Sequence, residues 1–136
     1  VIIDSDIKIT LDDTKDSFLA YTEKFDVITS KWRTGINSID IQKDFSQENI
    51  DQGIAHYNDA IMQLYALPVP KILSALHKTE LSYLRAELTL LNKIKNADKD
   101  PMAALLAGQN FQNMDDEFNK KMNEQLQLFL KTVNKA

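Results

Sequence analysis

Cysteine is absent from this 136-residue sequence, and glycine and proline occur only three times each. Without cysteine, the chain has no disulfide, no thiolate metal ligand and no thiol nucleophile. Three isolated glycines do not form a phosphate-binding loop, and neither a G-x-S-x-G motif nor the serine, histidine and acid order of hydrolases is present. Nothing in the sequence supports catalysis, so we predict a non-enzymatic protein without a cofactor.

Long apolar runs and an excess of positive charge are also missing. No stretch of about 18 apolar residues occurs, so we expect no part of this sequence to insert into a membrane. The 16 basic and 20 acidic residues are mixed along the chain, for a net charge of -4. Such a chain has no obvious basic face to neutralise phosphates. We therefore predict a protein partner or self-association rather than a nucleic-acid partner.

The sequence begins at Val1, without a methionine, and contains no cleavable signal peptide. We expect that a leader was removed or that the start was trimmed, and a membrane anchor upstream of Val1 is an open alternative. The missing start, the absence of cysteine and a polar composition rich in Lys, Asn and Asp suit an exported bacterial domain. We predict an extracytoplasmic location, with a cytoplasmic location as the alternative.

Apolar residues make up 43% of the sequence, enough for one domain with its own core. They recur at spacings of three and four residues, as on the buried face of an amphipathic helix. This period predicts an all-α fold in a single domain over residues 1–136, an up-down-up-down four-helix bundle with a short extended N-terminal segment. The expected elements are an extended leader over 1–11 and helices over about 12–36, 47–66, 70–96 and 101–134.

Capping residues and prolines mark the expected helix boundaries. Ser46 has the acceptor oxygen of an N-cap, and Asp100 before Pro101 combines a capping carboxylate with a proline in the first turn. Pro68 and Pro70 separate two helices, because each forces the residue before it out of the helical region. The helix after this proline corner has the widest apolar arc, so we expect it to be central in the bundle.

The first eleven residues, VIIDSDIKITL, alternate between apolar and polar side chains towards their end, which is typical of an extended segment. An isolated strand is not stable alone. The segment lies on the bundle, pairs with another chain or forms a flexible leader, and we favour an ordered or frayed tail over a pairing strand. Its candidate partner surface consists of Ile2, Ile3, Ile7 and Ile9.

The sequence has two histidines, His56 and His77, and neither follows a glutamate by three residues. The Glu-x-x-His pair that binds two metals in carboxylate-bridged bundles is therefore missing. His77 has Glu80 three residues later, but the order is reversed and further ligands are lacking. We predict no metal site, and a structural His77 that pairs with a buried tyrosine or with a backbone carbonyl near the proline corner.

Aromatic residues recur at helical spacing along the expected helices. Trp32, Tyr57 and Tyr83, together with His77, are the candidates to line a ligand cavity between helices. An aromatic stripe at this spacing is more often part of the core than a cavity wall. Both interpretations stay open on the sequence alone.

Two segments carry a resemblance to other proteins. PVPKILSALH at residues 68–77 is a proline corner and a helix with an early histidine, and NADKDPMAALLAGQNF at residues 96–111 contains an Asp-Pro helix start. This pattern, within residues 67–111, resembles uncharacterised, predicted exported helical proteins of reduced-genome bacteria. The resemblance implies export, and it implies no activity and no catalytic residue.

Two hypotheses of function follow. The first is a non-enzymatic extracytoplasmic helical-bundle protein that acts through protein–protein contacts, as a component of a cell-envelope or surface assembly. The alternative is a sensor-type bundle that binds a small molecule between its helices.

Overall fold

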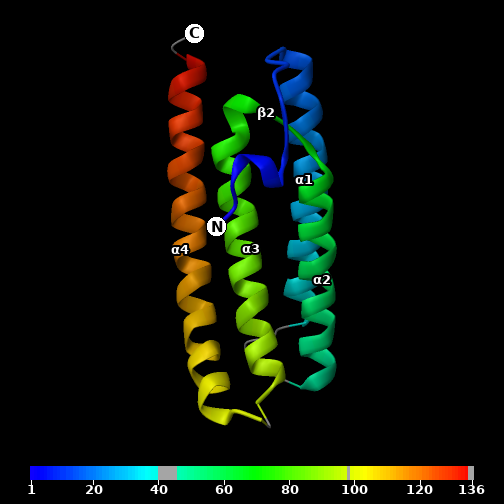
Figure 1. Ribbon diagram of the computed structural model, residues 1–136, viewed down its shortest axis with the longest axis vertical. Helices are drawn as coiled ribbons and strands as arrows, with labels where there is room; N and C mark the ends of the chain where they lie inside the picture. The colour runs from blue at the N-terminus through cyan, green and yellow to red at the C-terminus, as the bar shows by residue number, and fades with distance from the viewer. Residues whose placement is uncertain (40–45, 98, 135–136) are drawn as a thin grey trace.

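The computed structural model describes residues 1–39, 46–97 and 99–134. In these residues it contains four α-helices: α1 (Lys15–Ile39), α2 (Gln47–Ala66), α3 (Ser74–Lys95) and α4 (Pro101–Asn134). Successive helices run in opposite directions along the long axis of the molecule (Figure 1). The predicted all-α bundle with up-down-up-down topology is confirmed.

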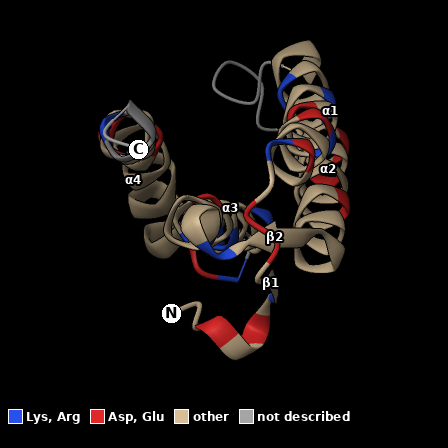
Figure 2. Cartoon of the chain, turned by 90° about the horizontal axis from the view of Figure 1, so that it is seen from above, with Lys and Arg blue, Asp and Glu red and all other residues tan. Residues whose placement is uncertain are grey.

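The helix α3 lies between α4 on one side and α1 with α2 on the other, as two perpendicular views show (Figure 1, Figure 2). Each helix packs on its neighbour in sequence, and the contact between α3 and α4 is the most extensive. The wide apolar arc of α3 is needed because the helix is covered on both sides. The predicted central position of this helix is confirmed, and α4 stands at one edge of the bundle.

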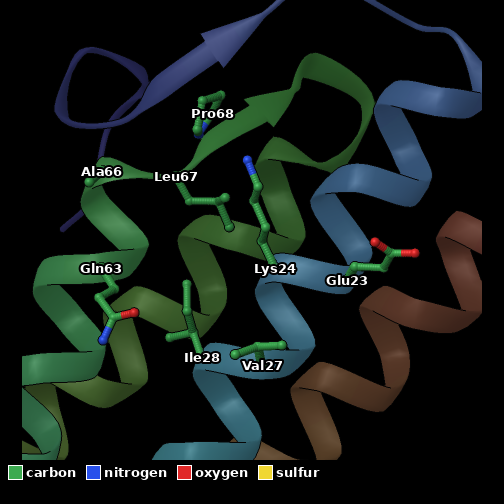
Figure 3. Close-up of a pocket in the computed structure, with 8 residues that line it drawn as sticks. All are labelled: Glu23, Lys24, Val27, Ile28, Gln63, Ala66, Leu67 and Pro68. Atoms are coloured by element: carbon green, nitrogen blue, oxygen red, sulfur yellow. The ribbon is translucent and has the colours of Figure 1, made fainter.

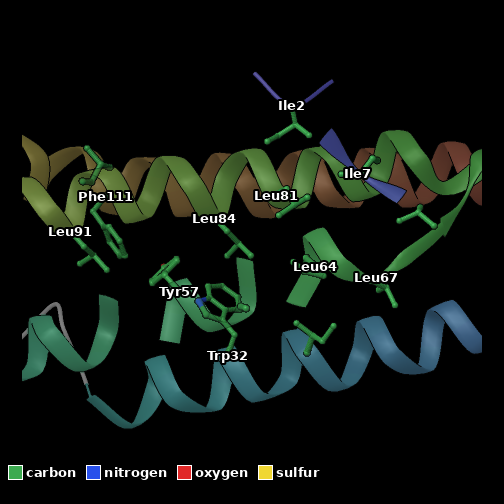
Figure 4. Packing of buried hydrophobic residues seen from close by; sticks show 14 of the residues in the cluster. Ile2, Ile7, Trp32, Tyr57, Leu64, Leu67, Leu81, Leu84, Leu91 and Phe111 are labelled. Atoms are coloured by element: carbon green, nitrogen blue, oxygen red, sulfur yellow. The ribbon is translucent and has the colours of Figure 1, made fainter. Parts of the chain in front are cut away.

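Apolar side chains from all four helices form the core (Figure 4). The leucines Leu64, Leu81, Leu84 and Leu91 have no exposed surface. Burying one leucine side chain stabilises the fold by about 1.5–3 kcal/mol. Three of these four leucines belong to α3, so the central helix carries much of the packing energy.

The N-terminal segment folds back onto the bundle. Its strand β1 (Lys8–Thr10) pairs in parallel with β2 (Pro68–Pro70), so that Ile9 lies opposite Val69. Prolines on both sides of Val69 are compatible with this pairing, because adjacent residues of a strand direct their backbone N–H groups to opposite sides, so Val69 can face β1 while both prolines face away from it. The proline corner is therefore a strand as well as a helix boundary.

A short 3-10 turn, η1 (Asp4–Asp6), precedes β1 and lies over α3. Ile2 and Ile7, on either side of the turn, are each 7% exposed and belong to the core. Asp4 Oδ1 pairs with Nζ of Lys78 on α3 at 2.5 Å. Of the alternatives left open by the sequence, the segment is ordered and lies on the bundle, and its strand pairs within the same chain.

Local signals place the starts of α2 and α4 where the sequence predicts them. Ser46 Oγ accepts the N–H of Asn49 at the start of α2, and Asp100 Oδ1 accepts the N–H of Ala103 at the start of α4. A second 3-10 turn, η2 (Lys71–Leu73), joins β2 to α3.

The helix α1 differs from its predicted range at both ends. It begins at Lys15 rather than near residue 12, because the hydroxyl of Thr14 accepts the N–H of Ser17 at 3.1 Å and caps the helix there. It then continues through Gly35 to Ile39, which is buried in the core. Glycine destabilises a helix by about 1 kcal/mol relative to alanine, and burial of the last turn offsets this cost at Gly35.

Candidate functional site

Three polar side chains of α3 are buried in an otherwise apolar core. His77, Glu80 and Glu87 are 0%, 3% and 1% exposed. Their spacings of three and seven residues place them along one side of the helix, together with Leu84 and Leu91. Carboxyl groups are almost never fully buried unless they are paired. This polar side of α3 is therefore the candidate functional site.

His77 is bonded at both ring nitrogens. Nε2 lies 2.8 Å from the carbonyl oxygen of Leu64 at the end of α2, and Nδ1 lies 2.8 Å from the hydroxyl of Tyr21 on α1. A carbonyl oxygen only accepts, so Nε2 carries the proton and the Tyr21 hydroxyl donates to Nδ1. Burial lowers the pKa of His77, which favours the neutral ring. Both partners expected for His77, a buried tyrosine and a backbone carbonyl near the proline corner, are present, and the two bonds join α1, α2 and α3.

One residue from each helix meets near the centre of the bundle, and we call Trp32, Tyr57, Glu87 and Phe111 the central cluster. The rings of Trp32 and Tyr57 are in edge contact, with centroids 5.4 Å apart, and Tyr57 contacts Phe111 at 6.5 Å. Glu87 Oε2 accepts a hydrogen bond from the Tyr57 hydroxyl at 2.5 Å. Figure 4 shows Trp32 and Tyr57 side by side between α1 and α3.

Two polar atoms of the central cluster have no hydrogen-bond partner among the described residues. They are the indole Nε1 of Trp32 and Oε1 of Glu87. A buried donor or acceptor without a partner costs about 1–3 kcal/mol. Native cores contain few such atoms, so a donor and an acceptor left open in one cluster require an explanation.

Charged groups from three helices surround this cluster. Burial raises the pKa of Glu80 to about 7, and the field of Arg33 on α1 opposes the shift. Burial also raises the pKa of Glu87 to about 7, and the hydrogen bond from Tyr57 opposes it. Asp115 on α4 is half-buried, and burial raises the pKa of its carboxyl as well. Glu80 and Glu87 therefore exchange their protons near neutral pH.

The four residues predicted to line a ligand cavity do not all meet. Trp32 and Tyr57 are neighbours in the central cluster. His77 lies beside Tyr21, at 5.7 Å between ring centroids. Tyr83 is half-buried and its ring faces α4. The fold brings the first two residues together and places the other two in separate contacts.

The buried glutamates are the part of the site that sequence reasoning missed. Glu80 and Glu87 are seven residues apart, and Glu80 follows His77 by three. This spacing, close to the apolar stripe of α3, is the available signal. Glutamates at such spacing also occur on solvated helix faces, so the pattern by itself does not distinguish a buried pair from an exposed one.

The predicted partner surface of the N-terminal segment is divided by the fold. Ile2 and Ile7 are covered by the chain's own core, and Ile9 in β1 is half-buried. Ile3 is 55% exposed. The four isoleucines therefore do not form one continuous free surface.

Several hollows lie on the surface of the bundle, and two of them have volumes above 400 Å³. The first is a groove of about 540 Å³ where α1 meets the end of α2, with Ile28 and Leu67 in its wall and Lys24 beside them (Figure 3). The second is a groove of about 440 Å³ between α3 and the start of α4, and it is mainly apolar. Its lining includes Ile94, Ala104, Leu105, Gly108 and Phe111.

Within the described ranges 1–39, 46–97 and 99–134, no group of three or more His, Asp or Glu side chains is placed to hold a metal ion. Over the same ranges, no helix combines the length and the apolar character needed to cross a bilayer.

No protein-family model, curated protein or solved structure matches this chain.

Proposed function

We propose that this chain is a non-enzymatic, extracytoplasmic helical-bundle protein that acts through protein–protein contacts, as a component of a cell-envelope or surface assembly. The observation that carries the proposal is an apolar patch on the first two turns of α4. Its side chains Met102, Leu105 and Leu106 are 66%, 60% and 52% exposed. Residues three and four apart are neighbours on a helix, and clustered apolar side chains in water are typical of contact sites.

The α4 patch adjoins the groove between α3 and α4. Leu105 lies at the edge of this groove, and Gly108 leaves space inside it, because a methyl group added there would meet no atom within 4 Å. A surface with both a projecting side chain and a hollow is self-complementary, as a two-fold interface requires. A second copy of this chain is therefore the first partner to test.

Placing negative charges on the patch tests this contact. We expect the wild-type protein to self-associate with rising concentration in sedimentation velocity. The variant Leu105→Glu with Leu106→Glu should stay monomeric, because association would desolvate two carboxylates. The control Asn119→Glu with Asn123→Glu adds the same charge further along α4, where both side chains are exposed. A wild-type protein that is monomeric at every concentration contradicts this proposal.

The extracytoplasmic location is supported by the resemblance of residues 67–111 to predicted exported proteins. Proteolysis of intact cells that make the natural protein tests it. An exported protein is cleaved while the cells are intact and a cytoplasmic control protein is not. Cleavage that occurs only after lysis counts against export.

A second candidate function is a sensor-type bundle that binds a small molecule between its helices. The open donor and acceptor of the central cluster, Trp32 Nε1 and Glu87 Oε1, favour it. A ligand that binds only the folded protein raises its melting temperature. We expect a small polar ligand to raise Tm for the wild type and for Glu48→Gln at an exposed position of α2, and to have a weaker effect on Glu87→Gln. No shift across a panel of such molecules removes this candidate.

A further inference from the structure

We propose that α4 is released from the other three helices when the carboxyl groups of Glu80, Glu87 and Asp115 lose their protons. The exposed surfaces would then be the inner face of α4 and the side of α3 that α4 covers. This release does not depend on the α4 patch of Met102, Leu105 and Leu106, which faces water while α4 is packed on α3.

The carboxyl of Glu87 lies where α2, α3 and α4 meet. Tyr57 on α2 donates to Oε2, and Oε1 has no partner among the described residues. Glu87 is 1% exposed, so an ionised Oε1 has neither water nor a donor to stabilise its charge. Besides burial, the charge of Asp115 on α4 raises the pKa of Glu87 across the interface between α3 and α4.

The other charged groups around the site are mostly acidic. Arg33 on α1 is the cation whose field reaches both Glu80 and Asp115. Along α3 the charge of Glu87 raises the pKa of Glu80, and along α4 the charge of Asp116 raises the pKa of Asp115. The tyrosines that face the glutamates are Tyr21 from α1 and Tyr57 from α2.

The edge of the α3–α4 interface carries charges of both signs. Burial raises the pKa of Tyr83 on α3, Glu117 and Glu124 of α4 raise it further, and Glu124 also pairs with Lys121 at 3.6 Å. At the buried site itself there are three carboxyl groups, and the field of Arg33 reaches two of them, Glu80 and Asp115. Like charges repel most strongly where water is excluded.

The contact of α4 with α3 is the most extensive between two helices, but we expect α4 to be the helix that moves because polar bonds and strand pairing join the other three helices to one another. His77 links α1, α2 and α3, and the pairing of β1 with β2 joins the N-terminal segment to the proline corner. In contrast, α4 contacts the bundle largely through apolar side chains such as Ala107, Phe111 and Phe118. A single connection near residues 96–100 then allows α4 to move as a unit.

Because burial raises the pKa of both glutamates to about 7, their protons leave near neutral pH. A modest change in pH is therefore sufficient to charge the site, while the exposed carboxylates elsewhere are already ionised.

Energy transfer from Trp32 measures the release directly. Trp32 is the only tryptophan, and the absence of cysteine allows one labelling position to be chosen freely. In one protein Asn119→Cys carries a dansyl acceptor on α4, and in the other Gln52→Cys carries it on α2. Both positions are exposed. Between pH 5 and pH 9, transfer to the α4 label should fall with a midpoint near 7, and transfer to the α2 label should stay constant.

Neutral variants identify the groups responsible. Glu80→Gln with Glu87→Gln should abolish the pH dependence of transfer to the α4 label, whereas Glu23→Gln, at an exposed position of α1, should leave it as in the wild type. If the double variant does not fold, Asp115→Asn at a half-buried position provides the second test, with a smaller fall in transfer expected.

Three results would overturn the release of α4. The first is transfer to the α4 label that stays constant in the wild type over the whole pH range. The second is a fall in transfer to both labels together, as in global unfolding. The third is a pH dependence of transfer in the neutral variants that equals that of the wild type.

Discussion

At the scale of single residues, the most unusual feature is a carboxyl group at the centre of an apolar bundle with only one of its oxygens bonded. Glu87 depends on the Tyr57 hydroxyl, and its second oxygen is open. An apolar residue of similar size would avoid the desolvation cost altogether. The presence of Glu87 is therefore better explained by a response to protons or to a polar ligand than by stability.

Removing the Tyr57 hydroxyl should destabilise the protein without changing its shape. Tyr57→Phe leaves the ring contacts in place and takes away the donor to Glu87, so we expect the free energy of unfolding to fall by about 1–3 kcal/mol. Urea denaturation followed by Trp32 fluorescence measures the change.

The matched control is Tyr65→Phe, which removes a hydroxyl that bonds Arg85 at the exposed surface. We expect a loss below about 0.5 kcal/mol there. Equal losses of unfolding free energy in the two variants would show that burial does not make the Tyr57–Glu87 hydrogen bond more stabilising than an exposed one.

At the scale of elements, the N-terminal segment shows how a short strand is stabilised without a large sheet. Its strand β1 has only three residues, and its pairing with β2 is supported by the burial of Ile2 and Ile7 on the bundle. The segment is therefore bound by packing as much as by backbone pairing.

Shortening a buried side chain of the N-terminal segment should weaken its packing on the bundle. We expect Ile7→Ala to lower the free energy of unfolding by about 2–4 kcal/mol, since it leaves a cavity in the core. Ile3→Ala, at a position 55% exposed, should change it by less than about 0.5 kcal/mol. Chemical denaturation measures both, and a neutral Ile7→Ala would mean that the segment is not docked in solution.

Two helical glycines should respond differently to alanine because their surroundings differ. At Gly108 an added methyl group meets open space, so Gly108→Ala should raise the free energy of unfolding by about 1 kcal/mol through helix propensity. At Gly35 the methyl would lie 2.5 Å from the imidazole of His56 on α2. His56 would have to move, so we expect no gain from Gly35→Ala. Thermal unfolding of the two variants in parallel decides the comparison.

At the scale of the whole molecule, three helices form a connected unit and α4 lies at its edge. The helices α1, α2 and α3 share the His77 bonds and most of the core, while α4 packs mainly on α3. A helix attached by one side is the natural element to move or to contact a partner. Both the contact patch and the proposed release therefore concern α4.

Stability should fall as pH rises through neutrality. The pKa of Glu80 and of Glu87 is about 7 in the folded protein and 4.5 ordinarily, so the folded state holds more protons between these values. Their contribution is complete below pH 4.5 and is lost as pH rises to about 7. We expect the free energy of unfolding to be lower at pH 8 than at pH 5.5 by on the order of 3 kcal/mol.

His77 changes the free energy of unfolding with pH in the opposite direction. Its pKa lies below the ordinary 6.5, so its contribution is present at higher pH and is lost as pH falls below 6.5. In Glu80→Gln with Glu87→Gln, the loss between pH 5.5 and pH 8 should therefore disappear and stability should rise with pH. Urea titrations at the two pH values distinguish these outcomes, and an unchanged profile in the double variant would show that other groups are responsible.

Much of the architecture follows from local rules that the sequence obeys. The start of α4 is an example, because Asp100 and Pro101 act within one turn of each other. A tyrosine or a backbone carbonyl near the proline corner was predicted as the partner of His77, because few partners satisfy a histidine on an apolar face, and the structure has both. The start of α1 was misplaced by three residues, since several side chains there can serve as caps.

The sequence by itself determined the helices, their order and the central place of α3, because periodicity, caps and prolines act over a few residues. Only the tertiary structure decided that residues 8–10 pair with residues 68–70, and that Glu87 meets Tyr57, thirty positions away in sequence. Burial of a carboxyl group is a property of everything packed around it. A helical period indicates which side chains share a face, and the packing of the other helices decides which of them lose their water.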